Sequence, residues 1–217
     1  MSNYDAVIFD LDGTLLDTSE GVLRSLDHAI RSMGLPEIGY DVKRTFIGPP
    51  MQRSFQRVFG LDAAEAMKAA DKFRERYKGD DLLLAVPYDG IYETIKSLNA
   101  AGIGTAVATY KRIDYAEKIL EHFGFADICS VICGSDFEGK LSKRDIIENA
   151  IKSLNVSDYS RAVMVGDSDN DAIGAKEIGT AFIAVTYGFG FADKKDADEF
   201  SNVGVADTPE GILRFIL

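Results

Sequence analysis

Short apolar runs recur along the chain, separated by stretches with helical spacing. Five of these runs are rich in β-branched residues and are continuous rather than alternating: DAVIF, IGTAVA, DICSVI, RAVMVG and TAFIAVT. Such runs are typical of strands buried on both faces of a parallel sheet. A weaker sixth run, VGVAD, lies near the C-terminus. The alternation of these runs with helical patterns predicts an α/β fold with right-handed crossovers.

The helical patterns between the later runs begin and end at recognisable signals. Ile91, Ile95 and Leu98 share one helix face and are followed by Gly102. Ser142 can cap the next helix but one, and the tripeptide Thr208-Pro209-Glu210 has the form of a helix start with proline in the first turn. We therefore expect helices after these points.

The region from Thr18 to Leu83 shows only helical periodicity. Val22, Leu26 and Ile30 lie on one face, and a later Asp62-x-x-Glu65 pattern marks a further helix start. Roughly 65 residues without a strand are far too many for a loop. The sequence therefore predicts a helical domain, residues 18–83, inserted into a core domain formed by residues 1–17 and 84–217.

Polar side chains are expected where the predicted strands end. In sheets of this kind, ligands bind beyond the carboxyl ends of the strands. The segments that follow the first four predicted strands contain, in chain order, Asp10 and Asp12, then Thr109, Tyr110 and Lys111, then Lys140 and Lys143, and finally Asp167 and Asp171. Because these segments lie at one edge of the sheet, we expect acidic residues, a hydroxyl group and a lysine to come together there.

This set of groups suits phosphoryl transfer. Clustered carboxylates can share a hard cation, and oxygen ligands suit Mg²⁺. A hydroxyl, backbone amides and a lysine complement phosphate oxygens. A carboxylate such as Asp10 can attack phosphorus to form an aspartyl phosphate. Asp12, two residues further along an extended segment, shares its side and can handle the proton of the leaving group.

Other interpretations of the same residues are weaker. The stretch DSDND suggests a calcium loop beginning at Asp167, but that loop needs glycine at its sixth position and glutamate at its twelfth, where this chain has Ala172 and Ile178. The same count from Asp10 also fails. Lys111, taken alone, is typical of a solvated surface lysine.

Composition narrows the possible partners. The chain has 217 residues and a formal charge of −11, with a sequence pI of about 4.7. Such a balance disfavours nucleic acid and anionic membranes, which both attract basic surfaces. We expect Cys129 and Cys133 to be reduced thiols. The first residues lack a signal-peptide pattern, and no apolar run approaches the ~20 residues that span a bilayer, so we expect a cytoplasmic protein. A monomer and a homodimer both remain open.

The sequence resembles the haloacid dehalogenase-like superfamily, most of all its phosphoglycolate-phosphatase-like group. The segments FDLDGTLLD, VATYK, KLSKRD and VGDSDNDAIGAK stand in the order of that family, and FIGPPM is similar to a phrase of that group. The resemblance implies a Rossmann-like core with a small α-helical cap domain inserted after the first strand. It also implies a Mg²⁺-dependent phosphatase that acts on a small phosphorylated metabolite, such as phosphoglycolate or a nucleotide, through an aspartyl phosphate.

The resemblance assigns three catalytic roles. Asp10 would be the nucleophile and a Mg²⁺ ligand. Asp12 would be the general acid and base, and would bind Mg²⁺ through its backbone carbonyl. Lys143 would neutralise the nucleophile and the phosphoryl group, with Lys140 as the alternative because the family's lysine is often followed by proline and Lys143 precedes Arg144.

The remaining implied roles concern the metal and the substrate. Asp167 would ligate Mg²⁺, and Asp171 would support the metal's water shell. Thr109 and Tyr110 would bind the phosphate, although relatives often have a small residue or an amide at the second position. The Tyr110 side chain would reach into the pocket or pack against the cap. Arg53, in the cap, is the candidate to meet a second anionic group of the substrate.

Two other functions remain open at this stage. A sugar-phosphate mutase of the same superfamily would use the same residues but return the phosphoryl group to the substrate. A non-hydrolytic receiver module also uses aspartates, a hydroxyl, a lysine and Mg²⁺, but it lacks a helical insert and needs a much shorter chain. Repeated turnover of a phosphate ester would separate a hydrolase from a receiver.

Overall fold

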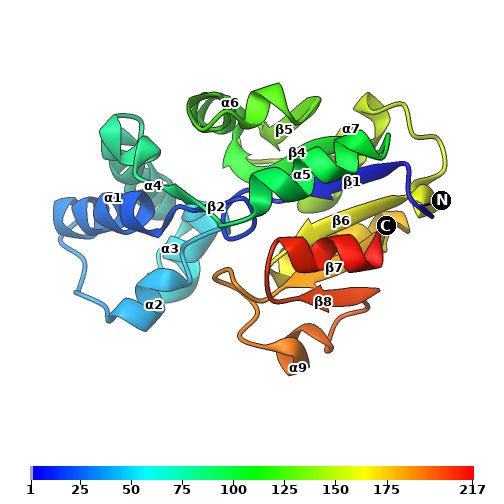
Figure 1. The fold of residues 1–217 in the computed structure, drawn as a ribbon. Helices are drawn as coiled ribbons and strands as arrows, with labels where there is room; N and C mark the ends of the chain where they lie inside the picture. Colours follow the sequence, from blue (N-terminus) through cyan, green and yellow to red (C-terminus); the bar gives the residue numbers. More distant parts are fainter. Residues whose placement is uncertain (1) are drawn as a thin grey trace. The chain divides into compact units, whose positions relative to one another are not determined.

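The computed structural model describes residues 2–217, which form two compact units. Residues 2–16 and 87–217 make an α/β unit, and residues 17–86 make a helical unit (Figure 1). The chain passes from one unit to the other at β2 (Leu16–Asp17) and β3 (Val86–Pro87), which pair as a two-stranded sheet. These boundaries differ from the predicted ones by one residue on the first passage and three on the second.

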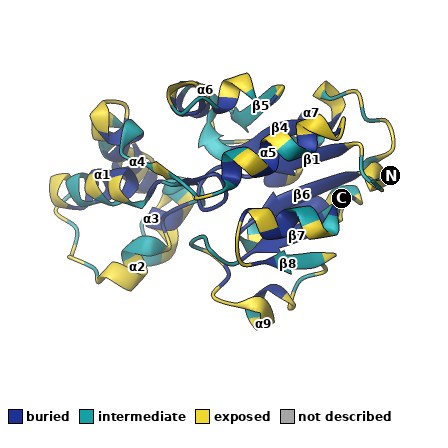
Figure 2. Ribbon diagram, viewed as in Figure 1, coloured by how far each residue is buried: buried dark blue, intermediate teal, exposed yellow. Residues whose placement is uncertain are grey.

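The α/β unit is built on a parallel sheet of six strands in the order β5-β4-β1-β6-β7-β8. The strands are β1 (Ala6–Phe9), β4 (Gly104–Arg112), β5 (Val131–Ser135), β6 (Ala162–Gly166), β7 (Ala181–Val185) and β8 (Gly204–Ala206). Each predicted apolar run contributes to one of them. β1 lies centrally and is buried along its whole length (Figure 2). The predicted α/β class with a parallel sheet is confirmed.

Helices cover both faces of this sheet. They are α5 (Ile91–Ala100), α6 (Ile113–His122), α7 (Lys143–Ser153), α8 (Asp169–Ile178) and α9 (Lys194–Ala197), with 3₁₀ turns η2 (Phe125–Asp127), η3 (Tyr159–Arg161) and η4 (Glu210–Phe215). α7 and α8 pack on one face, where Ile146 and Ala172 join a core with Ile8 of β1. No helix within residues 2–217 is long and apolar enough to cross a membrane.

Most of the predicted helix signals act as expected. The Ser142 side chain accepts a hydrogen bond from the Asp145 backbone N–H and begins α7 in a capping box. The Thr208-Pro209-Glu210 signal differs, because it begins the six-residue 3₁₀ helix η4 rather than an α-helix. A segment this short adopts the tighter turn readily.

The structure corrects the predicted end of the second core strand. We expected the chain to leave the sheet before Thr109, but β4 continues to Arg112. Its pairing with β5 is irregular between Ala108 and Arg112. Thr109, Tyr110 and Lys111 therefore lie within a strand, where successive side chains point to opposite faces. This alternation separates the environments of the three residues.

The helical unit contains α1 (Ser19–Ser32), α2 (Tyr40–Arg44), α3 (Met51–Phe59), α4 (Ala63–Tyr77) and the 3₁₀ turn η1 (Asp80–Leu83). α4 packs against both α1 and α3. The Asp62 side chain caps α4 in a capping box with Glu65, as the sequence predicts. α2 is an addition to the prediction, since it buries none of its residues and therefore leaves no apolar periodicity to detect.

Candidate active site

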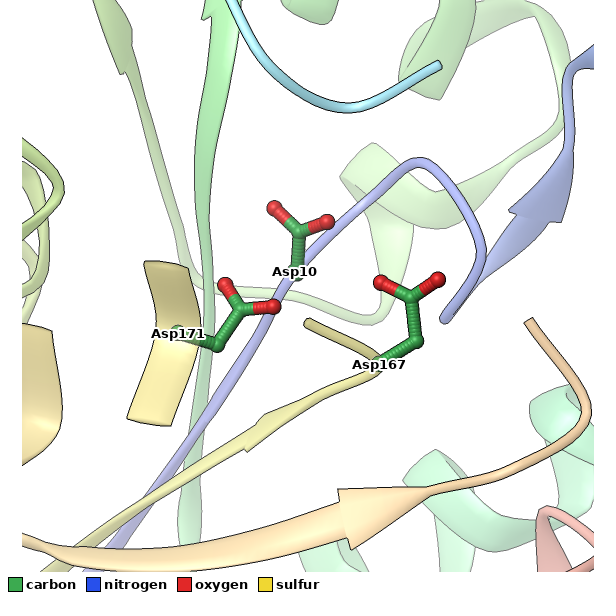
Figure 3. Close-up of side chains that lie close together, drawn as sticks. All are labelled: Asp10, Asp167 and Asp171. Carbon is green, nitrogen blue, oxygen red and sulfur yellow. The ribbon is translucent and has the colours of Figure 1, made fainter. Parts of the chain in front are cut away.

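Three buried carboxylates converge at the carboxyl edge of the sheet. Asp10 follows β1, Asp167 follows β6, and Asp171 lies in the first turn of α8. One carboxylate oxygen from each residue lies within 4.8 Å of the other two, and Figure 3 shows the three groups approaching one another. These residues come together because neighbouring parallel strands end at one edge.

Lys143 connects two members of this cluster. Its Nζ atom lies 2.5 Å from Asp10 Oδ1 and 2.7 Å from Asp171 Oδ1, and its side chain is 4% exposed. Lys143 is the first residue of α7. The Ser142 cap fixes the start of that helix and thereby the position of the Lys143 backbone. The alternative lysine, Lys140, is exposed and pairs with Glu138. Of the two predicted candidates, Lys143 is the one within the cluster.

The charges of this cluster perturb one another. Burial raises the pKa of Asp10 well above its ordinary value; Lys143 opposes this rise, and the neighbouring carboxylates reinforce it. Burial, together with Asp171, raises the pKa of Asp167 to about 7. Burial alone would lower the pKa of Lys143, but Asp10 and Asp171 raise it above its ordinary value. The cluster therefore holds more negative charge than the lysine compensates.

Asp12 has a partner that the sequence did not reveal. Lys111 Nζ lies 3.0 Å from Asp12 Oδ1, and each of the two side chains is 6% exposed. From sequence, Lys111 taken alone is typical of a solvated lysine, whereas in the fold its side chain is buried against Asp12. Since β4 continues, Lys111 is held at the sheet edge beside the Asp10–Asp12 loop. The alternation of β4 is the signal that could have identified it.

The other two predicted residues of β4 are also placed. Thr109 is buried, and its Oγ1 accepts a hydrogen bond from the Lys111 backbone N–H at 3.1 Å. Tyr110 is half-buried, and its hydroxyl oxygen accepts a hydrogen bond from the Lys143 backbone N–H at 2.9 Å. The Tyr110 side chain thus contacts the helix that carries the lysine.

A loop after β7 also supports the cluster and was missed from sequence. The backbone N–H groups of Phe189 and Gly190 donate to Asp167 Oδ2, at 2.7 and 3.1 Å. The loop comes close because Gly188 lacks a side chain: a Cβ there would lie 2.3 Å from the Gly13 carbonyl oxygen. Gly13 itself has a φ of +86°, and a Cβ on it would lie 2.2 Å from Asp167 Oδ2. Backbone N–H donors cannot be recognised from residue types, although the run TYGFG indicates a tight loop.

Arg53 is the one predicted site residue outside the α/β unit. It lies on α3 of the helical unit, and its side chain is exposed. Its predicted contact with substrate stays a prediction.

The carboxylate cluster is compatible with a divalent cation. Its ligands are all carboxylate oxygens, which suit hard cations. Burial, reinforced by the neighbouring carboxylates, raises the pKa values of Asp10 and Asp167, and a bound cation would offset this penalty on their ionised forms. The residues present therefore fit a metal of this kind.

Comparison with known proteins places the chain in a family. The model of the haloacid dehalogenase-like hydrolases matches residues 7–185, which include every residue of the cluster. The chain belongs to this family. The predicted family membership is thereby confirmed.

Other members of the haloacid dehalogenase-like hydrolases are similar over most of the chain. A 5'-nucleotidase from Pseudomonas aeruginosa is 35% identical over 90% of this chain and 89% of that protein. A phosphoglycolate phosphatase from Agrobacterium fabrum is 34% identical over 84% of this chain and 80% of that protein. A crystal structure of a predicted phosphatase from Clostridium acetobutylicum has a TM-score of 0.90 and 34% identity, covering 97% of this chain and 99% of that one. These relatives agree with the predicted class of phosphatases.

Proposed function

We propose that the protein is a Mg²⁺-dependent phosphatase that hydrolyses a small phosphomonoester through an aspartyl phosphate on Asp10. The observation that carries the proposal is the contact of Lys143 with both Asp10 and Asp171 inside a buried carboxylate cluster. A purely structural ion pair would need only one carboxylate. Two or more carboxylates around one lysine leave negative charge that suits a cation and a transferring phosphoryl group.

The first step forms the covalent intermediate. An Asp10 carboxylate oxygen attacks phosphorus, and the bond between phosphorus and the ester oxygen breaks. The leaving oxygen takes a proton from Asp12, so that it departs as an alcohol. Lys143, 2.5 Å from Asp10 Oδ1, favours the ionised form of the nucleophile and offsets charge on the phosphoryl oxygens. Thr109, which is buried in the neighbouring strand β4, would bind one of these oxygens.

The second step regenerates the enzyme. Asp12, now ionised, accepts a proton from water, and the water oxygen attacks phosphorus. The bond between phosphorus and Asp10 breaks, which releases inorganic phosphate and restores the carboxylate. Lys111, with its Nζ atom 3.0 Å from Asp12 Oδ1, would hold the ionised Asp12 side chain in place between the two proton transfers.

Mg²⁺ would be held by Asp10 and Asp167, with the Asp12 backbone carbonyl as a further ligand and Asp171 beside its water shell. When bound, it would neutralise charge and orient the phosphoryl group. The hydrogen bonds from Phe189 and Gly190 fix one oxygen of Asp167 and leave the other for a cation.

The relatives suggest which substrates to test. One is named a 5'-nucleotidase and another a phosphoglycolate phosphatase, so nucleoside monophosphates and phosphoglycolate are the first candidates. Arg53 is the proposed partner of a second anionic group on such a substrate.

The proposal is tested by turnover of p-nitrophenyl phosphate with Mg²⁺, followed by a panel of these esters. We expect many turnovers for the wild type and none above background for Asp10→Asn. Asp169→Asn is the matched control, because Asp169 is an exposed aspartate at the start of α8 and should leave the rate unchanged. A single stoichiometric phosphorylation without release would contradict a hydrolase and favour a receiver module. Transfer of the phosphoryl group back to a sugar phosphate would favour a mutase.

A further inference from the structure

Tyr110 lies on the opposite side of β4 from its two neighbours. Lys111 reaches Asp12, whereas Tyr110 packs with the core cluster to which α7 and α8 contribute. The same alternation places Ala106 and Ala108 of β4 in this cluster. The Tyr110 ring therefore continues a row of strand residues that face α7.

The Tyr110 hydroxyl contacts the first turn of α7. The first N–H groups of an α-helix have no partner within the helix. The Ser142 side chain accepts from Asp145, which leaves the N–H of Lys143 to another acceptor. The Tyr110 hydroxyl oxygen is that acceptor, at 2.9 Å. Tyr110 thus caps the backbone N–H of the same residue that carries the ammonium group.

The ring of Tyr110 also lies near the other end of Lys143. Lys143 Nζ is 5.8 Å from the ring centroid, within the range in which an aromatic face attracts a cation. The lysine is therefore restrained at its backbone by the hydroxyl and near its ammonium by the ring. Its Nζ atom meanwhile contacts Asp10 and Asp171.

We propose that Tyr110 is a positioning residue that fixes Lys143 against Asp10, rather than a ligand of the substrate phosphate. The proposal rests on the proposed function of Asp10 and Lys143. A long lysine side chain has many rotamers. If its backbone and its ammonium group are already held in place, less conformational entropy has to be lost when the transition state forms. Loss of Tyr110 should therefore lower kcat and leave KM almost unchanged.

The central experiment compares Tyr110→Phe with the wild type in Mg²⁺ and p-nitrophenyl phosphate. The change removes one hydrogen-bond acceptor and keeps the ring, so we expect kcat to fall about 3- to 10-fold, with KM within about twofold. Tyr110→Leu, which also removes the ring, should lower kcat further. Tyr159→Phe is the matched control, because the Tyr159 hydroxyl donates to Glu148 on the same helix, away from its start. It should leave kcat unchanged.

A double-variant cycle separates positioning from direct binding. If Tyr110 acts through Lys143, Tyr110→Phe should have almost no further effect in a Lys143→Ala background. Equal effects in both backgrounds would overturn the proposal. A rise in KM at constant kcat would overturn it as well, because that result indicates a direct contact with substrate.

Amide hydrogen exchange at Lys143 measures its hydrogen bond to the Tyr110 hydroxyl and does not depend on enzymatic activity. Tyr110→Phe should speed exchange of the Lys143 backbone N–H several-fold, and Tyr159→Phe should not. If the wild type shows no turnover, the proposed phosphatase fails, and faster exchange would still support the positioning contact. Unchanged exchange in Tyr110→Phe would overturn the contact, whatever the activity.

Discussion

Lys111 Nζ lies 3.0 Å from Asp12 Oδ1, and both side chains are almost fully buried. A buried ion pair of this kind adds little net stability compared with an apolar pair, but removal of one partner leaves a costly buried charge. At this place the pair also orients the carboxylate that we propose as general acid and base. It links the end of β4 to the loop after β1.

Replacement of Lys111 with Met should therefore destabilise the protein and lower its rate of turnover. We expect the free energy of unfolding to fall by about 3–5 kcal/mol, measured by urea denaturation. Lys140→Met is the control, since the exposed Lys140 should change the free energy by less than about 0.5 kcal/mol. The double variant Lys111→Met/Asp12→Asn should lose less stability than the sum of the single changes. A Lys111→Met protein as stable as the control would show that the pair is unimportant.

The roles proposed for Asp12 and Asp167 predict different effects on metal binding. The Asp12 side chain pairs with Lys111 and lies outside the three-carboxylate cluster, whereas Asp167 is a member of it. Asp12→Asn should keep Mg²⁺ affinity within a few-fold while cutting turnover by about 10²- to 10⁴-fold. Asp167→Asn should weaken Mg²⁺ binding strongly, as measured by calorimetry. Equal losses of affinity in the two variants would contradict the assigned roles.

The stability of the metal-free protein should depend on pH through Asp167. Burial and Asp171 raise its pKa from the ordinary 3.8 to about 7 in the folded state. A raised pKa stabilises the folded state at low pH, and this contribution is lost as pH rises toward about 7. Between these pH values the wild type should lose up to about 1.4 kcal/mol per pH unit relative to Asp167→Asn.

This pH effect can be measured by urea denaturation in EDTA from pH 4.5 to 8. Asp167→Asn removes the titrating group, so the difference between the two proteins should change with pH in favour of the variant. Added Mg²⁺ should reverse the change for the wild type at pH 8. A difference that stays constant over the whole range would refute the assignment.

The sequence by itself determined the parallel sheet and most of its helices. Apolar runs such as AVIF of β1 are buried on both faces, and capping residues such as Ser142 and Asp62 act through neighbours three positions away. It also brought Asp10, Asp167 and Lys143 into one hypothesis. Parallel strands end at one edge, so topology was enough to bring the two aspartates together, whereas the choice of Lys143 over Lys140 followed the family resemblance.

Tertiary structure alone decided where β4 ends and what its last residues touch. Polar residues such as Thr109 and Lys111 carry no apolar signal, yet pairing along β5 keeps the chain extended up to Arg112. The resulting alternation sends Lys111 to Asp12 and Tyr110 to the start of α7. The amides that bind Asp167 were equally hidden, because every residue except proline has the same backbone N–H. Sequence patterns record burial and local capping, whereas contacts between distant segments depend on the packed fold.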